Sequence, residues 1–253
     1  MFEQRRTEAL KTLVITRDPM IVHTLSVLKA SGFRIPEEGK SAREWCEQQA
    51  HSGDADAQLA FAQLLDYGIF GPRDSKASVE WIRRAASQLH PAAMMAYSPH
   101  VELGIGSGEP DPSRAVSLMR DSADRGYASA WTVLASWYEL GPQLEVDKGK
   151  ARDCYRKAAA LGCAIAQQIV GNELLHSDDY AEKLEGLAYL EISASQGLKA
   201  AHEVLSAEFL SGEHGLPVNA AIARLHQESA ERIEKEASEI FSDDSSTQKK
   251  ILN

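Results

Sequence analysis

Long apolar runs are missing from this sequence. No window approaches eighteen consecutive apolar residues, the length that a membrane-spanning helix needs. The N-terminus, residues 1–6, leads into an amphipathic stretch rather than into the apolar segment of a secretory signal. Three cysteines, Cys46, Cys154 and Cys163, form no C-x-x-C pair, and their odd number argues against a disulfide framework. We therefore expect a cytoplasmic protein without a membrane span.

Clusters of basic residues are also missing. The chain has 27 Lys and Arg against 37 Asp and Glu, which is a formal net charge of -10. No basic run is longer than Arg83-Arg84 or Lys249-Lys250. Affinity for a nucleic-acid backbone depends on clustered Lys and Arg. Nucleic acid is therefore excluded as the main partner.

Recognisable catalytic and metal-binding motifs are absent as well. The eight histidines form no H-E-x-x-H motif, and the sequence contains no G-x-S-x-G elbow. The alternating glycines Gly104, Gly106 and Gly108 lack the preceding strand that a phosphate-binding loop requires. The sequence predicts a protein that is not an enzyme and that has no cofactor and no metal site.

What the sequence does have is a repeat of about 36 residues. A glycine-like slot recurs at Gly53, Leu89, Gly126, Gly162 and Gly197. A bulky or apolar residue comes eight positions before each slot, at Trp45, Trp81, Leu118, Cys154 and Tyr189, and Leu225 continues the series. Pairs of small residues keep the same step, at Ala85-Ala86, Ser122-Ala123, Ala158-Ala159, Ser193-Ala194 and Ser229-Ala230. A fixed period in this range is typical of stacked supersecondary units, which serve binding more often than catalysis.

One repeat, residues 53–89, predicts two helices joined by a short loop. Acidic residues after Gly53 favour a helix start, and Gly68 is suited to close that helix in a left-handed conformation. Pro72 prevents the helix from continuing through the loop. A second helix follows from Ser75, with Trp81 on its packed side. The segment is therefore expected to form an antiparallel hairpin of helices.

Small residues at fixed positions of the first helices predict close packing. One column reads Ala57, Ala93, Ala130, Ala166 and Ala201, and another reads Ala62, Ser98, Ala135, Gly171 and Ser206. Large apolar residues fill a third column, at Leu25, Phe61, Tyr97, Leu134, Val170 and Leu205. Burying each large side chain is worth roughly 1.5–3 kcal/mol, and no hairpin can bury its apolar face alone. The columns predict an all-α fold that is stabilised by contacts between neighbouring hairpins.

These columns resemble the Sel-one-like repeat (SLR), a branch of the tetratricopeptide-like solenoids. The pattern, approximately G-x-A-x-A-Q-x-x-L-G-x-x-Y-x-x-G and then K-A-x-x-W-x-x-x-A-A-x-x-G, is matched best from Gly53 to Gln58 and from Lys76 to Trp81. It returns after Gly126 and Gly162, and it covers roughly residues 17–233. The resemblance implies a right-handed α-solenoid of about six antiparallel hairpins with capping helices at both ends, of a bacterial type.

The expected domain limits follow from the register. We expect a capping helix at 1–16, a solenoid at 17–241, and a disordered polar tail at 242–253. The six units run at about 17–52, 53–88, 89–125, 126–161, 162–196 and 197–241. Pro99 falls inside the first helix of the third unit, where it predicts a kink or a local irregularity.

In solenoids of helical hairpins the first helices line the concave face, so their residues outside the packing columns are candidates for binding a partner. Nine such residues are Leu64, Met95, His100, Trp131, Trp137, Asn172, Glu173, Glu203 and Glu208. Trp131 and Trp137 are candidate anchors, because exposed tryptophans are enriched at interfaces. The alternative is that one of them packs within its own hairpin. The three glutamates would suit a basic segment of the partner.

Three functions are compatible with this sequence. We favour a non-catalytic adaptor or regulator that binds a peptide or protein in the concave groove, as a monomer or homodimer. Some secreted family members resemble β-lactamases in reported activity and carry a cysteine pair in each repeat, whereas only Cys154 and Cys163 could pair here. A hydrolase is therefore an alternative, and so is an immunity or inhibitor protein that binds a toxin or effector.

Overall fold

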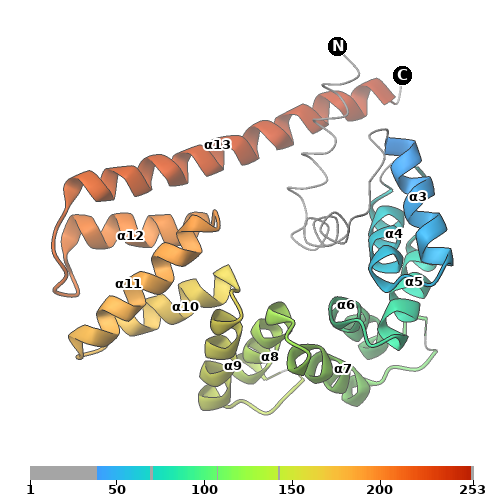
Figure 1. Cartoon of the computed structure of the whole chain (residues 1–253), viewed down its shortest axis with the longest axis horizontal. Coiled ribbons are helices and arrows are strands. Elements are labelled where there is room, and N and C mark those ends of the chain that lie inside the picture. The colour runs from blue at the N-terminus through green and yellow to red at the C-terminus, as the bar shows by residue number, and fades with distance from the viewer. Residues whose placement is uncertain (1–38, 69–70, 107, 142, 252–253) are drawn as a thin grey trace. The chain divides into compact units, whose positions relative to one another are not determined.

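The computed structural model describes residues 39–251 apart from 69–70, 107 and 142, and these residues form helices and no strand (Figure 1). The helices are α3 (Gly39–His51), α4 (Ala55–Tyr67), α5 (Ser75–Ser87), α6 (Pro91–Glu102), α7 (Pro112–Asp124), α8 (Ala128–Leu140), α9 (Lys148–Ala160), α10 (Ala164–Leu175), α11 (Tyr180–Ser195), α12 (Lys199–Ser211) and α13 (Ala220–Ile251). The all-α repeat fold is confirmed. The expected capping helix at 1–16 and the expected start of the first repeat lie outside the described residues.

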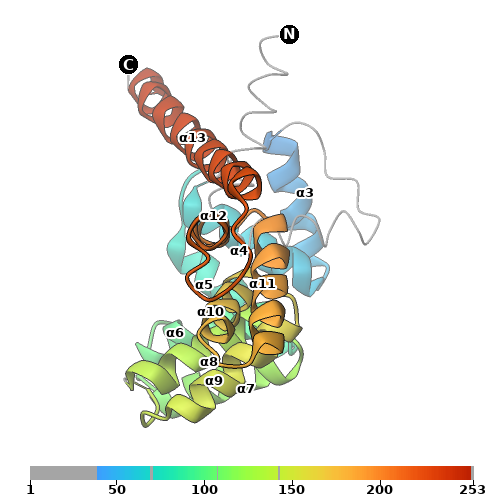
Figure 2. The ribbon, with the colours of Figure 1, turned by 90° about the vertical axis from the view of Figure 1, so that its left-hand side faces the viewer.

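The chain divides into two compact units, residues 1–130 and 131–253. In the first unit, each of the helices α3 to α7 packs against the next one along the chain. In the second unit the same holds from α9 to α13, and α10 also contacts α12. Figures 1 and 2 both show α12 beside the first part of α13. None of the helices in the described ranges combines the length and the apolar content that crossing a membrane requires.

The glycine-like slot is a backbone requirement. The φ angles at the five slots are positive, at 99° for Gly53, 62° for Leu89, 87° for Gly126, 88° for Gly162 and 83° for Gly197. Leu89 is the one non-glycine residue with positive φ among the residues described. A side chain in this region costs about 1–2 kcal/mol. The turn between successive hairpins therefore keeps its left-handed geometry even where glycine has been replaced.

The predicted packing columns are buried. The alanine column Ala57, Ala93, Ala130, Ala166 and Ala201 is 0% exposed throughout. The described members of the large column, Phe61, Tyr97, Leu134, Val170 and Leu205, are no more than 4% exposed. Small side chains at the first column let neighbouring helices approach, and the large ones fill the space beside them. This part of the prediction is confirmed.

Aspartates begin most of the second helices. The carboxylates of Asp74, Asp111, Asp147 and Asp179 each accept a hydrogen bond from a backbone N–H in the first turn of α5, α7, α9 and α11. Such a cap satisfies an N–H that has no partner within the helix and is worth about 1 kcal/mol. The caps set where each second helix starts after a loop of variable length.

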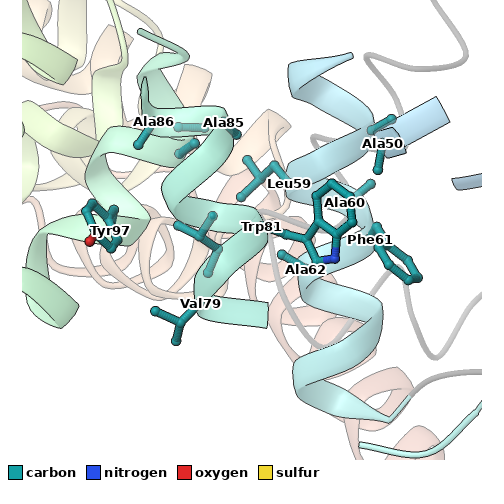
Figure 3. Packing of buried hydrophobic residues seen from close by; sticks show 14 of the residues in the cluster. Ala50, Leu59, Ala60, Phe61, Ala62, Val79, Trp81, Ala85, Ala86 and Tyr97 are labelled. Carbon is teal, nitrogen blue, oxygen red and sulfur yellow. The ribbon is translucent and has the colours of Figure 1, made fainter. Parts of the chain in front are cut away.

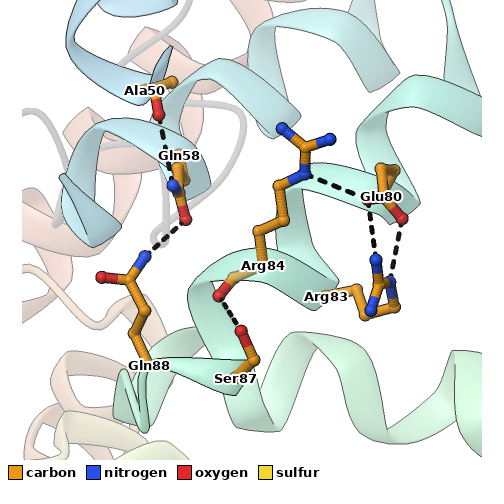
Figure 4. A network of polar contacts seen from close by, with 7 residues as sticks. All are labelled: Ala50, Gln58, Glu80, Arg83, Arg84, Ser87 and Gln88. Carbon is orange, nitrogen blue, oxygen red and sulfur yellow. Dashed lines mark hydrogen bonds and ion pairs between the residues drawn. The ribbon is translucent and has the colours of Figure 1, made fainter. Parts of the chain in front are cut away.

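A glutamine joins three helices in two of the repeats. Gln58 Nε2 donates to the carbonyl of Ala50 at the end of α3 over 3.2 Å, and Gln58 Oε1 accepts from Gln88 Nε2 over 2.9 Å (Figure 4). In the second unit Gln167 makes the same two contacts, with Ala159 and Gln196. Gln58 is 4% exposed. Its amide therefore holds the ends of two second helices to the first helix between them.

Replacing Gln58 by alanine is expected to lower the free energy of unfolding by about 2 kcal/mol, because a buried amide and its hydrogen bonds are lost. Met94 occupies the equivalent position in the next repeat and is 2% exposed. Gln58→Met should therefore cost less than Gln58→Ala. Urea titrations followed by circular dichroism measure both values. A Gln58→Met variant as stable as the wild type would contradict the network, because both substitutions remove the amide. Equal losses for the two variants would mean that filled volume is unimportant at this position.

One local expectation stays a prediction and another differs from the structure. α6 runs through Pro99, which is exposed, and the kink expected there stays a prediction. The carbonyl of Ala96 accepts a hydrogen bond from His100 Nδ1 over 3.0 Å in this turn. The tail expected at 242–253 is helical as far as Ile251, because α13 spans 32 residues. Adding residues to a helix that has already formed is favourable compared with starting a new one. The prediction of disorder considered only the polar composition of the tail and not the helix that precedes it.

Candidate protein-binding surface

Two of the nine predicted binding residues are inside the protein. Leu64 and Glu208 are each 4% exposed, so the prediction that they contact a partner is wrong. Leu64 belongs to α4, in which every residue from 57 to 65 is buried. A helix that is apolar all round is covered on every side. Glu208 is held by His214, whose Nδ1 lies 2.6 Å from Glu208 Oε2 and whose backbone N–H donates to Oε1 over 3.2 Å.

The other two glutamates have basic neighbours. Glu173 on α10 forms an ion pair with Arg152 on α9. Glu203 pairs with Lys199 over 3.1 Å, one turn away on α12. Exposed pairs of this kind contribute little stability, but they cancel charge locally. The predicted acidic end of a groove is therefore largely neutralised, and the argument for a basic partner segment loses its support.

The two tryptophans have different environments. Trp131 packs against the cluster of buried residues that includes Ala158 and Val170, and Lys157 Nζ lies 4.2 Å from its ring centroid. Its position in the repeat is the one that Gln58 and Gln167 occupy, and it contributes to packing within the second unit. Trp137 is partly exposed. Met95 and His100 are also partly exposed, on α6 of the first unit.

A strip of mostly uncharged residues follows the first helices of the second unit. We call it the first-helix strip. Its members recur at helical spacing and are all partly or fully exposed: Thr132, Val133 and Ser136 on α8; Ile165, Gln168, Ile169 and Asn172 on α10; Ala200, Glu203, Val204 and Ala207 on α12. Glu203 is the one acidic or basic residue among them, in a chain of which 25% is charged. This strip is the best candidate surface for a partner.

Contacts between the helices place the strip on adjacent elements. Thr132 Oγ1 on α8 lies 3.5 Å from the Sγ of Cys163, which precedes α10. α10 in turn packs against α12. Residues three, four and seven apart share one helix face, so Ile165, Ile169 and Asn172 are aligned along α10. Ile165 is 52% exposed, so its side chain is accessible to a partner.

Sequence reasoning missed two pairs of histidines in the second unit. His202 Nδ1 lies 2.9 Å from His226 Nδ1, and Phe209 stacks on His226. Burial and the neighbouring His226 lower the pKa of His202. His176 and His214 meet edge to face, with ring centroids 4.6 Å apart. The separation of 38 positions between the latter pair, close to one repeat, is a signal that could have identified it.

The cysteines and the other ligand-type side chains show no assembled site within the described ranges. Cys46, Cys154 and Cys163 are not in disulfides, and Cys154 is buried as the packing column predicts. Burial raises the pKa of Cys46 to about 12, which makes this thiol a poor nucleophile. No three His, Cys, Asp or Glu side chains of the described residues are placed to hold a metal ion together.

Comparison with known protein families identifies the repeat. Residues 53–88, 91–127 and 132–163 match the Sel1 repeat. Among curated proteins, the chain is 27% identical over 177 residues to an uncharacterised protein of Neisseria meningitidis serogroup B. That match covers 70% of this chain and 36% of the relative, so the chain spans about a third of the relative's length.

Solved structures share the fold. A Sel1 repeat protein from Oxalobacter formigenes is 24% identical, with a TM-score of 0.65 over 81% of this chain and 82% of that one. An immunity protein from Pseudomonas aeruginosa is 16% identical, with a TM-score of 0.59 over 89% of this chain and 86% of that one. Identities this low show likeness of fold alone.

Proposed function

We propose that this chain, a Sel1-repeat protein, binds another protein or a peptide through the first-helix strip of its second unit. The observation that carries this proposal is that Glu203 alone is acidic or basic along an exposed strip, in a chain of which 25% is charged. Depletion of charged residues distinguishes the centre of a protein interface from the rest of a surface. Helical repeat arrays present extended surfaces of this kind.

The composition of the strip favours a partner segment that is partly apolar. Ile165, Ile169 and Val204 offer branched apolar side chains, and Gln168 and Asn172 between them offer amide donors and acceptors. Such a surface can bury apolar side chains and still pair polar groups of a bound segment. We propose a non-catalytic adaptor or regulator, located in the cytoplasm, where the three free thiols remain reduced.

The substitution Ile165→Asp is expected to reduce capture of the partner at least tenfold, because a charge would be buried at the interface without a counter-charge. Ile192→Asp is the matched control. Ile192 is 47% exposed, close to the 52% of Ile165, but it lies on the second helix α11. The experiment is affinity capture from a lysate of the native host, quantified by mass spectrometry, with circular dichroism to show that both variants remain helical.

A partner that is recovered by the wild type and by Ile192→Asp, but lost by Ile165→Asp, would locate binding on the first-helix strip. Equal recovery by the two variants would contradict this location. The identity of the captured protein would then separate an adaptor from an inhibitor of a toxin or effector.

A further inference from the structure

The first unit contains a cavity that is distinct from the first-helix strip. Its volume is about 390 Å³, within the range of sites that hold small molecules or single side chains. Residues of α5, α6 and α7 and of the loop between α6 and α7 line it. They include Glu80, Arg83, Tyr97, Arg114 and Leu118. We propose that this cavity binds a glutamate side chain of an acidic segment in a partner protein.

Arg83 is held ready for such a ligand. Its Nε and Nη2 each donate to the carboxylate of Glu80 over 2.8 Å, and Arg84 Nε donates to the same carboxylate over 3.0 Å (Figure 4). The hydrogen bond from Arg83 is the largest of the effects that lower the pKa of Glu80 to about 2, so this carboxylate stays ionised. Fixing Arg83 in this way leaves its remaining N–H groups in a defined direction. A pre-ordered guanidinium loses less entropy when it binds a carboxylate.

Tyr97 supplies a hydroxyl donor to the lining of the cavity. The residue as a whole is 3% exposed, and it lines the cavity. No hydrogen bond within the described residues uses its hydroxyl, and its ring stacks on His100. An acceptor bound in the cavity would accept a hydrogen bond from this hydroxyl.

Arg114 supplies the second cation. Its backbone N–H is engaged by Asp111, but its guanidinium has no ion-pair partner in the described part of the chain. The charged residues of the lining are Arg83, Arg114 and Glu80, so the lining has a net positive charge. This is unusual in a chain whose formal net charge is -10. The positive lining selects for an anion.

The apolar part of the lining narrows the choice of anion. Ala86 and Leu118 offer walls against which methylene groups can pack. A glutamate side chain has both methylene groups and a carboxylate, whereas inorganic phosphate has no apolar part. Arg114 can pair with a carboxylate through parallel N–H donors, whereas the Nε and Nη2 donors of Arg83 are already used by Glu80. A glutamate from a partner protein therefore matches both halves of the cavity.

The test is a nuclear magnetic resonance titration of the full chain with a blocked peptide that has one central glutamate between alanines. The same peptide with glutamine is the neutral comparison. The glutamate peptide should shift the arginine side-chain resonances. The glutamine peptide should bind at least tenfold more weakly, because hydrogen bonds to a charged group are stronger than those to a neutral amide. Arg114→Gln should weaken binding by a similar factor, and Tyr97→Phe should weaken it several-fold.

Arg125→Gln is the matched control, because Arg125 is also exposed and follows the same helix, α7, but does not line the cavity. It should leave binding unchanged. Equal binding of the two peptides would overturn the proposal, as would equal losses in Arg114→Gln and Arg125→Gln. Competition between inorganic phosphate and the bound glutamate peptide gives a further check. If phosphate displaces the bound peptide at a lower concentration than the same peptide added in unbound form does, the site is a phosphate site and the proposal is overturned. None of these outcomes depends on the first-helix strip.

Discussion

Replacing Gly186 by leucine is expected to lower the free energy of unfolding by about 3 kcal/mol, the upper part of the usual range for overpacking. Gly186 on α11 lies against Gly171 on α10. A Cβ at Gly186 would lie 2.8 Å from the carbonyl oxygen of Gly171 and 3.1 Å from the backbone nitrogen of Leu175. Backbone atoms cannot rotate away, so the helices would have to separate.

Gly149→Leu is the control for this prediction. Gly149 is exposed in the first turn of α9, and the one atom near an added Cβ is the Oδ1 of Asp147 at 3.3 Å. Leucine has a higher helix propensity than glycine, so this change should be neutral or stabilising by up to about 1 kcal/mol. Urea denaturation followed by circular dichroism compares the two variants. If both unfold at the urea concentration of the wild type, the close approach of α10 and α11 is refuted.

The second large effect is expected for Trp81→Ala, which should lower the free energy of unfolding by about 4 kcal/mol. Trp81 is 7% exposed and lies among the buried residues of α4 and α5 (Figure 3). It contacts Phe61 edge to face, with ring centroids 5.7 Å apart, and His51 with centroids 4.9 Å apart. Arg84 covers its ring at 4.6 Å. One side chain thus joins α3, α4 and α5.

Trp81→Phe separates loss of volume from loss of these contacts. Phenylalanine retains a ring next to Phe61 and should cost less than half as much as alanine, because most of the cavity stays filled. Thermal unfolding monitored by circular dichroism measures both variants. A Trp81→Ala variant that unfolds within a few degrees of the wild type would show that the first unit does not depend on this residue.

Much of the fold could be predicted because its constraints repeat. A column such as Ala57, Ala93 and Ala130 states the same packing requirement in each unit, and all three residues are fully buried. The positive φ of Gly126 follows from the same register. A constraint that occurs once in the chain has no such repetition to reveal it. Gly186, where an added Cβ would lie 2.8 Å from the carbonyl oxygen of Gly171, is such a case.

The candidate surface was harder to predict, because exposure depends on what covers a helix. Leu64 and His100 occupy the same position of the repeat, yet Leu64 is buried and His100 is partly exposed. The near-continuous apolar character of residues 57–65 was the available signal for a helix covered all round. Glu208 was misjudged for another reason. Its partner His214 lies in the following loop, and no periodicity relates a helix residue to a loop residue.

The turn at Leu89 has a consequence for how such repeats change over evolutionary time. At Gly53, Gly126, Gly162 and Gly197 an added Cβ would meet no atom within 4 Å. Glycine is therefore favoured at these positions by the positive φ alone and not by lack of space. Leu89 adopts the same conformation without glycine, held by the helices on either side. A repeat can therefore lose its diagnostic residue while its geometry persists. A search for this repeat by its glycine alone would therefore pass over a turn whose geometry is intact.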